Sequence, residues 1–246
     1  MIKNLQKNMN GLAHIQLALL LAAVIAVVGV VGWKVQSNSS TPSTGISKVT
    51  QDKCTAAVND KQFCKFAGAF ASVTNYKAAV TAIDKTGQSA SYDLAYDSKN
   101  NISMVLKLNS QEQANVIVYS GITYSKDYTD GKWFKYASAD KNAPQALDLK
   151  KEFLKSDFKN DKGEQLTYKN LGTEKCDKLT CYKYQESDPQ KPTETDYLWF
   201  DTKNYLLRRV SVNDSKAGSN AEMTVTYGSV TISLPSPTKD APAVAQ

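Results

Sequence analysis

Most of the chain alternates between apolar and polar positions. Tyr76, Ala78, Val80 and Ala82 alternate with more polar residues, and this period of two recurs along eleven segments. Such alternation predicts β-strands with one buried face, and turn residues such as Lys85-Thr86-Gly87 separate them. The predicted strands cover residues 76–82, 92–96, 102–109, 114–119, 121–126, 132–136, 165–174, 180–187, 193–201, 205–213 and 222–232.

Two segments have helical spacing instead. Residues 55–73 place Val58, Phe63, Phe66 and Phe70 on one face, which predicts a helix. A second helix is predicted to begin at Pro144 and to end before Asp161-Lys162-Gly163. No strand–helix–strand alternation follows, so the pattern predicts an α+β domain with an antiparallel sheet of about eleven strands. The apolar side of the helix predicted from Pro144 consists of Leu147, Leu149, Phe153, Leu154 and Phe158.

The run from Leu12 to Trp33 is apolar and contains no charged residue. Its stretch from residue 15 to 33 would span about 28 Å as a helix, close to the ~30 Å hydrocarbon layer. Lys3 and Lys7 precede it, so the positive-inside rule places residues 1–11 in the cytoplasm. We therefore predict a retained transmembrane helix at 12–33, with the rest of the chain outside the cytoplasmic membrane.

A cleaved signal peptide is the alternative interpretation of this run. Signal peptides have apolar cores of about 7–15 residues, whereas this core is longer and ends in Trp33-Lys34, which suits an interfacial anchor. The Ser/Thr-rich residues 34–51 are typical of a flexible linker, and 235–246 of a disordered tail. Residues 52–234 are then one extracytoplasmic domain.

The charge balance excludes an obvious nucleic-acid interface. Lys3, Lys7 and Lys34 account for three of the thirty basic residues, which leaves 27 basic and 24 acidic side chains in the rest of the chain. The basic residues are scattered among acids rather than grouped in a stripe. We therefore predict no nucleic-acid partner, and the sequence leaves the oligomeric state open.

Four cysteines lie beyond the apolar run, which suits disulfides in an oxidising compartment. Three pairings are possible, and the spacing favours the local ones, Cys54 with Cys64 and Cys176 with Cys181. Neither spacing is that of a zinc site, and the only histidine is His14, within the apolar run. The sequence therefore predicts two disulfides, no metal and no cofactor.

The chemistry of common enzyme sites is missing. With its only histidine at position 14, the domain cannot form a Ser-His-Asp or Cys-His site, and it has no nucleophile elbow or phosphate-binding glycine loop. Its carboxylates are interpreted as mostly exposed charges at turns or on strands, and no enzymatic activity is predicted. These carboxylates are Asp93, Asp97, Glu112, Asp127, Asp130, Glu194, Asp196 and Asp201.

Three segments of the domain resemble those of a known family: residues 197–209, YLWFDTKNYLLRR, Cys181–Tyr184 before them and Tyr227–Val230 after them. This family comprises the half-barrel lipoprotein carriers and lipid-binding lipoproteins of the LolA/LolB and LppX/LprG group. The resemblance covers residues ~52–234 and implies a curved sheet with helices on its concave side. It implies a binding protein for lipid acyl chains or a lipidated protein, here anchored at the cell envelope.

An apolar concave surface is what such a ligand requires. Arg208 and Arg209 are candidates for contact with a lipid phosphate at its rim. Two other functions stay open: an envelope structural or interaction subunit with a filled core, and a stress sensor that acts through a protein partner. The inward-facing residues predicted to bind lipid are Tyr92, Leu94, Tyr96, Met104, Leu106, Leu108, Val118, Trp133, Tyr197, Trp199, Val225 and Tyr227.

Overall fold

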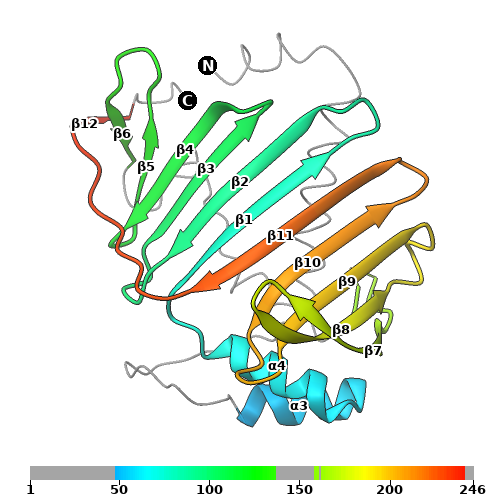
Figure 1. Cartoon of the computed structure of the whole chain (residues 1–246). Coiled ribbons are helices and arrows are strands. Elements are labelled where there is room, and N and C mark those ends of the chain that lie inside the picture. The colour runs from blue at the N-terminus through cyan, green and yellow to red at the C-terminus, as the bar shows by residue number, and fades with distance from the viewer. Residues whose placement is uncertain (1–47, 137–157, 161, 242–246) are drawn as a thin grey trace.

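One twelve-stranded sheet forms the body of the described protein. The computed structural model describes residues 48–136, 158–160 and 162–241. Two short helices lie together near the ends of the central strands (Figure 1). The strand order is β12-β6-β5-β4-β3-β2-β1-β11-β10-β9-β8-β7, so β12 and β7 form separate edges and the sheet is open.

Two antiparallel meanders meet at the centre of the sheet, where β1 pairs with β11. All eleven predicted strands form, although β11 ends at Tyr227 rather than at 232. The first meander consists of β1 (Tyr76–Ile83), β2 (Ser89–Tyr96), β3 (Ile102–Leu108), β4 (Gln111–Tyr119), β5 (Ile122–Lys126) and β6 (Trp133–Lys135). The second consists of β7 (Thr167–Cys176), β8 (Leu179–Ser187), β9 (Glu194–Asp201), β10 (Leu207–Asp214) and β11 (Ser219–Tyr227).

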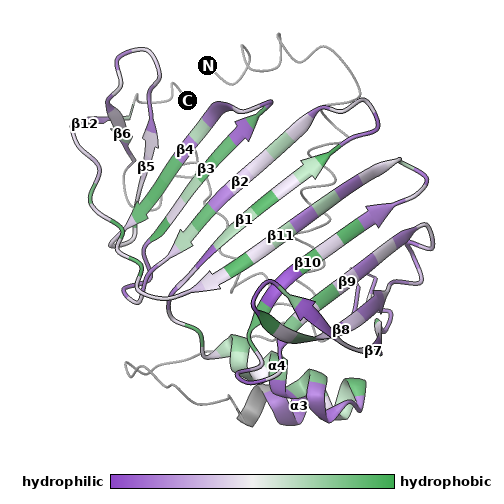
Figure 2. Cartoon of the chain, viewed as in Figure 1, coloured by the Kyte–Doolittle hydropathy of each residue, from purple (hydrophilic) through white to green (hydrophobic). Residues whose placement is uncertain are grey.

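The two faces of the sheet differ in polarity. Along β1 the residues alternate between buried and exposed, with Tyr76 and Ala78 buried and Lys77 exposed. Cross-strand partners share a face, so the register assigns every strand to one side or the other. We call the side of Tyr76 the helix face, because helix α4 packs on it, and the other side the outer face. Figure 2 shows the resulting mixture of apolar and polar bands along the strands.

The helix predicted at 55–73 is two helices, α3 (Lys48–Val58) and α4 (Lys61–Ala71). The chain breaks at Asn59, whose φ of 56° ends α3. Asp60 then caps α4, since its carboxylate accepts hydrogen bonds from the backbone N–H groups of Gln62 and Phe63. A disulfide between Cys54 and Cys64 joins the two helices, as predicted.

Helix α4 fixes the core of the second meander. Its Phe66 stacks on Phe200 of β9 with 4.6 Å between ring centroids, and Phe63 stacks on Tyr168 of β7 at 4.1 Å. The hydroxyl of Tyr184 in β8 donates to the Asp60 carboxylate at 2.9 Å. These aromatic contacts hold α4 against the helix face of β7–β9.

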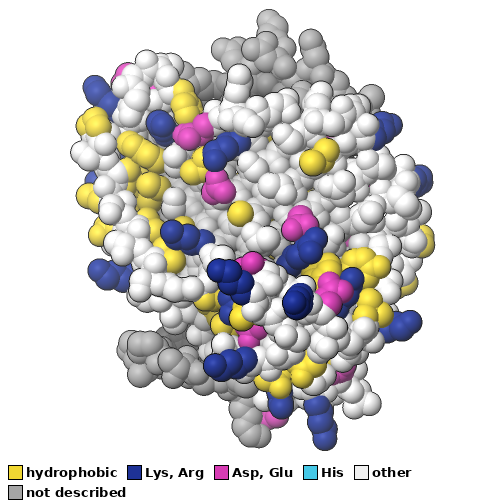
Figure 3. All heavy atoms as spheres, viewed as in Figure 1, with side chains coloured by type: hydrophobic (Ala, Val, Ile, Leu, Met, Phe, Trp, Pro, Cys, Tyr) yellow, Lys and Arg dark blue, Asp and Glu magenta, His cyan; other side chains and the backbone are white. Residues whose placement is uncertain are grey.

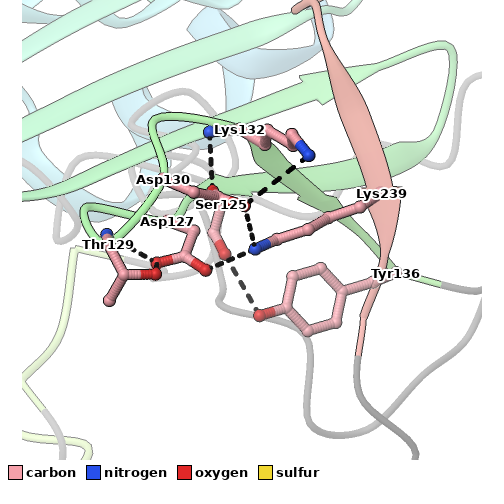
Figure 4. A network of polar contacts seen from close by, with 7 residues as sticks. All are labelled: Ser125, Asp127, Thr129, Asp130, Lys132, Tyr136 and Lys239. Carbon is pink, nitrogen blue, oxygen red and sulfur yellow. Dashed lines mark hydrogen bonds and ion pairs between the residues drawn. The ribbon is translucent and has the colours of Figure 1, made fainter.

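The tail predicted to be disordered contains a short strand, β12 (Thr238–Asp240), which pairs in parallel with β6. Lys239 explains the difference, because its ammonium group lies 2.6 Å from Asp127 and 2.9 Å from Asp130 in the β5–β6 turn. Figure 4 shows this network, in which Thr129 also donates to Asp127. The hydrogen bond from Lys239, with those from Thr129, lowers the pKa of Asp127 to about 2.

Replacing Lys239 by methionine is expected to release β12. The backbone N–H of Trp133 donates to the carbonyl of Pro237, so hydrogen exchange at this amide reports the attachment. We expect several-fold faster exchange in Lys239→Met. The control Lys132→Met should leave it unchanged, because Lys132 reaches Asp130 only at 3.9 Å. Equal exchange in both variants would contradict the role given to Lys239.

Several sequence predictions lie wholly or partly outside the described residues, among them the cytoplasmic segment 1–11 and the end of the tail, 242–246. The others are the apolar helix at 12–33, the linker at 34–51 up to Lys48, where α3 begins, and the helix from Pro144. In the part of the chain that the structure describes, neither helix has the length and apolar character needed to cross a membrane.

Candidate ligand-binding face

Nine of the twelve residues predicted to face a ligand lie on the helix face of β2, β3, β4 and β11. Tyr92 lies beside Leu106, Leu94 beside Met104, and Val118 beside Ile102, because these are cross-strand partners. The register therefore gathers them on one continuous apolar surface. The nine residues are Tyr92, Leu94, Tyr96, Met104, Leu106, Leu108, Val118, Val225 and Tyr227.

This surface is unevenly covered. Leu94, Tyr96 and Val225 are buried, and the hydroxyl of the half-buried Tyr227 donates to the carbonyl of Leu207. Five large side chains of β2–β4 are only half-buried, and burial raises the pKa of the tyrosine among them. We call these five the apolar strip: Tyr92, Met104, Leu106, Leu108 and Val118.

Trp133, Tyr197 and Trp199 were predicted to face inward, and the structure places them on the outer face. In β9 the helix face belongs to Leu198 and Phe200, which are buried in the core beneath α4. Residues 197–200 are all apolar, so alternation alone does not set which pair points inward. Trp133 is the cross-strand partner of Lys126, on the outer side of β5.

Trp199 is nevertheless 4% exposed, because cations cover it. The guanidinium of Arg209 lies 4.8 Å from its ring and the ammonium of Lys183 lies 5.0 Å from it. Its indole N–H donates to the Glu174 carboxylate. This cluster is a structural cation–π arrangement on the outer face.

Both arginines considered for a lipid phosphate form ion pairs within the protein. Arg208 forms an ion pair with the buried Asp201 at 2.9 Å and lies over the ring of Tyr227. Arg209 forms an ion pair with Glu222 at 2.6 Å. A phosphate would therefore compete with a protein carboxylate for each guanidinium.

The outer face also carries a depression of about 470 Å³ over β11, β1, β2 and β3. Its floor consists of short side chains between Lys77 and Asp93, and it is visible from the side shown in Figure 3. Short and polar groups offer an acyl chain less contact than the apolar strip does. The remaining outward-facing residues at this depression are Ala79, Ala95, Ser103, Val105, Thr224 and Thr226.

Two carboxylates on the helix face are buried, although Asp196 was expected to be an exposed charge and Glu186 was not considered. Glu186 of β8 and Asp196 of β9 are cross-strand partners, each 3% exposed, and Tyr168 of β7 is the next partner of Glu186. Burial raises the pKa of Asp196 to about 8, and burial beside Asp196 raises the pKa of Glu186 as well. Their period-two spacing from Tyr184 and Leu198 was the signal that sequence reasoning missed.

Three turn aspartates expected to be exposed are also buried, namely Asp97, Asp127 and Asp201. Each does lie at a turn, but its carboxylate points back and accepts backbone N–H groups of that turn. Such side-chain caps are buried because they replace water as the hydrogen-bond partner of the turn. Across the described ranges, no group of three or more acidic, cysteine or histidine residues has the placement of a metal site.

The class defined by these features is an open, mostly antiparallel sheet with helices and an apolar strip on one face. No protein-family model and no curated protein matches the sequence. Solved structures do match. LppX of Mycobacterium tuberculosis is 14% identical with a TM-score of 0.40, over 72% of this chain and 93% of that chain.

A LolA superfamily protein of Nitrosomonas europaea is 9% identical with a TM-score of 0.25, over 78% of this chain and 96% of that chain. The MucA/MucB complex of Pseudomonas aeruginosa matches at 9% identity and a TM-score of 0.38, over 67% and 57%. LppX and the LolA group are also the proteins named in the resemblance of residues 197–209. At TM-scores below 0.5 these likenesses carry no further argument, and the function is argued from the chain's own residues.

Proposed function

We propose that this protein is a membrane-anchored, extracytoplasmic and non-catalytic binding protein for a lipid acyl chain, free or attached to a protein. The observation that supports it is the apolar strip of β2–β4. Five large side chains, Tyr92 among them, are only half-buried there, whereas Val80 and Met223 on the neighbouring strands β1 and β11 of the same face are buried. Contact between apolar side chains and water is unfavourable, and a bound hydrophobic ligand would remove these side chains from water.

The chemistry of the strip suits a flexible hydrocarbon chain. Leu106 and Leu108 offer branched aliphatic contact, and the unbranched thioether of Met104 adapts to irregular shapes. No charged side chain interrupts the helix face between Tyr92 and Val118 in the described register. Selectivity would therefore come from shape and length rather than from a charged headgroup.

The predicted anchor limits how such a protein works. A transmembrane helix at 12–33 followed by residues 34–47 would hold the domain at a typical distance of about 20 Å from the membrane, the r.m.s. reach of a linker of this length. The two disulfides, Cys54–Cys64 and Cys176–Cys181, suit an oxidising compartment outside the cytoplasm. The domain would then receive, hold or sense a lipid at its own membrane rather than carry it across the envelope.

Polar substitution within the strip tests this function. We expect native mass spectrometry of the detergent-released full chain to show a retained lipid, and Leu106→Gln with Met104→Gln to reduce that species about tenfold or more. Burying a leucine or methionine side chain contributes about 1.5–3 kcal/mol, which the glutamines forfeit.

Ser103→Gln is the matched control, because Ser103 directly precedes Met104 on β3 but faces outward. It should retain lipid like the unaltered chain. A chain without retained lipid, even after lipid is added, would instead indicate a filled core and favour a protein partner. Equal loss in Ser103→Gln would show that the effect is not specific to the strip.

A further inference from the structure

Lysine side chains gather at the end of the sheet where β7 turns into β8 and β9 into β10. Lys175 is the cross-strand partner of Thr180, and the carbonyl of Thr180 accepts the backbone N–H of Thr202 at 3.0 Å. The two turns are therefore adjacent, which brings Lys178 and Lys203 to the same end. We call Lys65, Lys175, Lys178 and Lys203 the basic end.

Helix α4 contributes the fourth lysine. The ammonium of Lys65 lies 5.3 Å from the ring centroid of Tyr205 in the β9–β10 turn. Tyr205 in turn stacks on Tyr182 of β8. The basic end is thus built on three elements held by packed rings, and lysine side chains are visible on this part of the surface in Figure 3.

Little negative charge offsets these lysines. Asp201 is buried and engaged with Arg208, and Glu174 forms an ion pair with Lys183 at 3.4 Å. In the two turns the remaining exposed acid is Asp177. No lysine of the basic end forms an ion pair with another described residue, so their charges face solvent.

An apolar side chain projects among these charges. Leu179 is 42% exposed, directly after Lys178 in the hairpin. The Cys176–Cys181 disulfide closes this hairpin and holds the leucine and its lysines in place. Exposed leucine surrounded by lysine is the chemistry that binds an anionic membrane surface, where the apolar group enters the headgroup layer and the lysines meet phosphates.

The predicted transmembrane helix would bring the membrane close to this end. The described part begins with α3, which is bound to α4 by Cys54–Cys64 and lies beside it (Figure 1). Residues 34–47 separate α3 from the predicted transmembrane helix at 12–33. This linker is short, so the end that carries α3 and α4 is the end nearest the bilayer.

We propose that the basic end docks on the anionic lipid headgroups of the membrane that holds helix 12–33, with Leu179 in the headgroup layer. The inference rests on the anchor in the proposed function. The opposite end of the sheet is unsuited to this, since its β8–β9 and β10–β11 turns carry Asp188, Glu194 and Asp214 alongside Lys191 and Lys216. Docking would fix the orientation of the domain and hold it close to its lipid supply.

The test uses the full chain in vesicles with an environment-sensitive fluorophore at Lys178→Cys, or at Lys216→Cys as the matched control. Lipids that carry a quencher near the headgroup report contact. With phosphatidylglycerol present we expect strong quenching at 178 and little at 216. Quenching at 178 should decrease several-fold in pure phosphatidylcholine, and it should also decrease in high salt.

Reversing the charge of other lysines supplies a second test, which does not depend on the loss of Lys178 in the labelled variant. With the fluorophore moved to Leu179→Cys, Lys175→Glu with Lys203→Glu should reduce quenching, whereas Lys85→Glu with Lys216→Glu at the far end should not. Equal quenching at 178 and 216, or quenching indifferent to phosphatidylglycerol, would overturn docking. Flotation of the vesicles in high salt tests separately whether helix 12–33 attaches the chain to the membrane. A chain that floats with the vesicles but shows no quenching at 178 would contradict docking without contradicting the anchor.

Discussion

The stability of this protein is expected to fall as the pH is raised from about 4 to about 8, and Asp196→Asn is expected to remove much of that fall. Asp196 lies buried beside Glu186, and one oxygen of each carboxylate has no hydrogen-bond partner in the described structure. Burial raises the pKa of Asp196 to about 8 and raises that of Glu186 in the same direction.

The sign follows from proton binding. Between its unfolded pKa near 3.8 and its folded pKa, Asp196 binds a proton in the folded state only, so added protons favour folding. Each pH unit in this window costs about 1.4 kcal/mol of unfolding free energy, or on the order of 6 kcal/mol over the whole window. In the upper part of this window, above the ordinary pKa of glutamate, the side chain that ordinarily titrates is histidine, and the chain has only His14.

Guanidinium unfolding of the full chain in micelles, with disulfides intact, measures this slope. Asp196→Asn should be more stable than the unaltered chain at pH 8 and similar to it near pH 4, and adding Glu186→Gln should flatten the slope further. Asp93→Asn is the control, because Asp93 is an exposed acid paired with Lys107. A stability that is constant or rises over this range would contradict the buried protonated pair.

Removal of the Phe200 ring is expected to cost about 3–5 kcal/mol of unfolding free energy, the largest effect of any single truncation in the core. Phe200 is fully buried between α4 and the sheet. Its ring stacks on Phe66 at 4.6 Å and on Tyr184 at 5.3 Å, and it lies near Tyr182. An alanine there leaves a cavity bounded by rings fixed in the sheet, which cannot collapse to fill it.

Phe134→Ala provides the comparison, since Phe134 is half-buried in the short strand β6. It should cost far less than Phe200→Ala in the same unfolding experiment. Under conditions where Phe200→Ala is still folded, its lipid retention should be unchanged, because the apolar strip lies on β2–β4. Loss of lipid with Phe200→Ala alone would show that the site extends beneath α4.

The strands could be predicted because alternation is a local signal. Each of the eleven segments alternates over at least part of its length, and β1 is the clearest case, with every second residue buried. Where a strand does not alternate, as at residues 197–200, the sequence does not show which residues face inward. Trp199 was therefore assigned to the wrong face. Only the packing of Leu198 and Phe200 beneath α4 decides that strand's phase.

Other features depend on contacts between segments distant in sequence. Strand β12 exists because Lys239 meets Asp127, more than a hundred residues earlier, and a Pro-rich tail gives no sign of this pairing. Likewise, Arg208 was predicted at a ligand rim although Asp201, seven residues before it, already binds it. The break at Asn59 was readable in principle, since Asn59-Asp60 combines a left-handed residue with a helix cap.

The central claim is that the apolar strip holds an acyl chain, and photoaffinity labelling tests it most directly. A diazirine-bearing fatty acid would be added to the full chain in its membrane and activated, and the modified residues would be identified by mass spectrometry. We expect adducts on Tyr92, Met104, Leu106 and Leu108, which unlabelled fatty acid displaces. Adducts confined to the apolar segment at 12–33, or spread equally over both faces of the sheet, would contradict the claim.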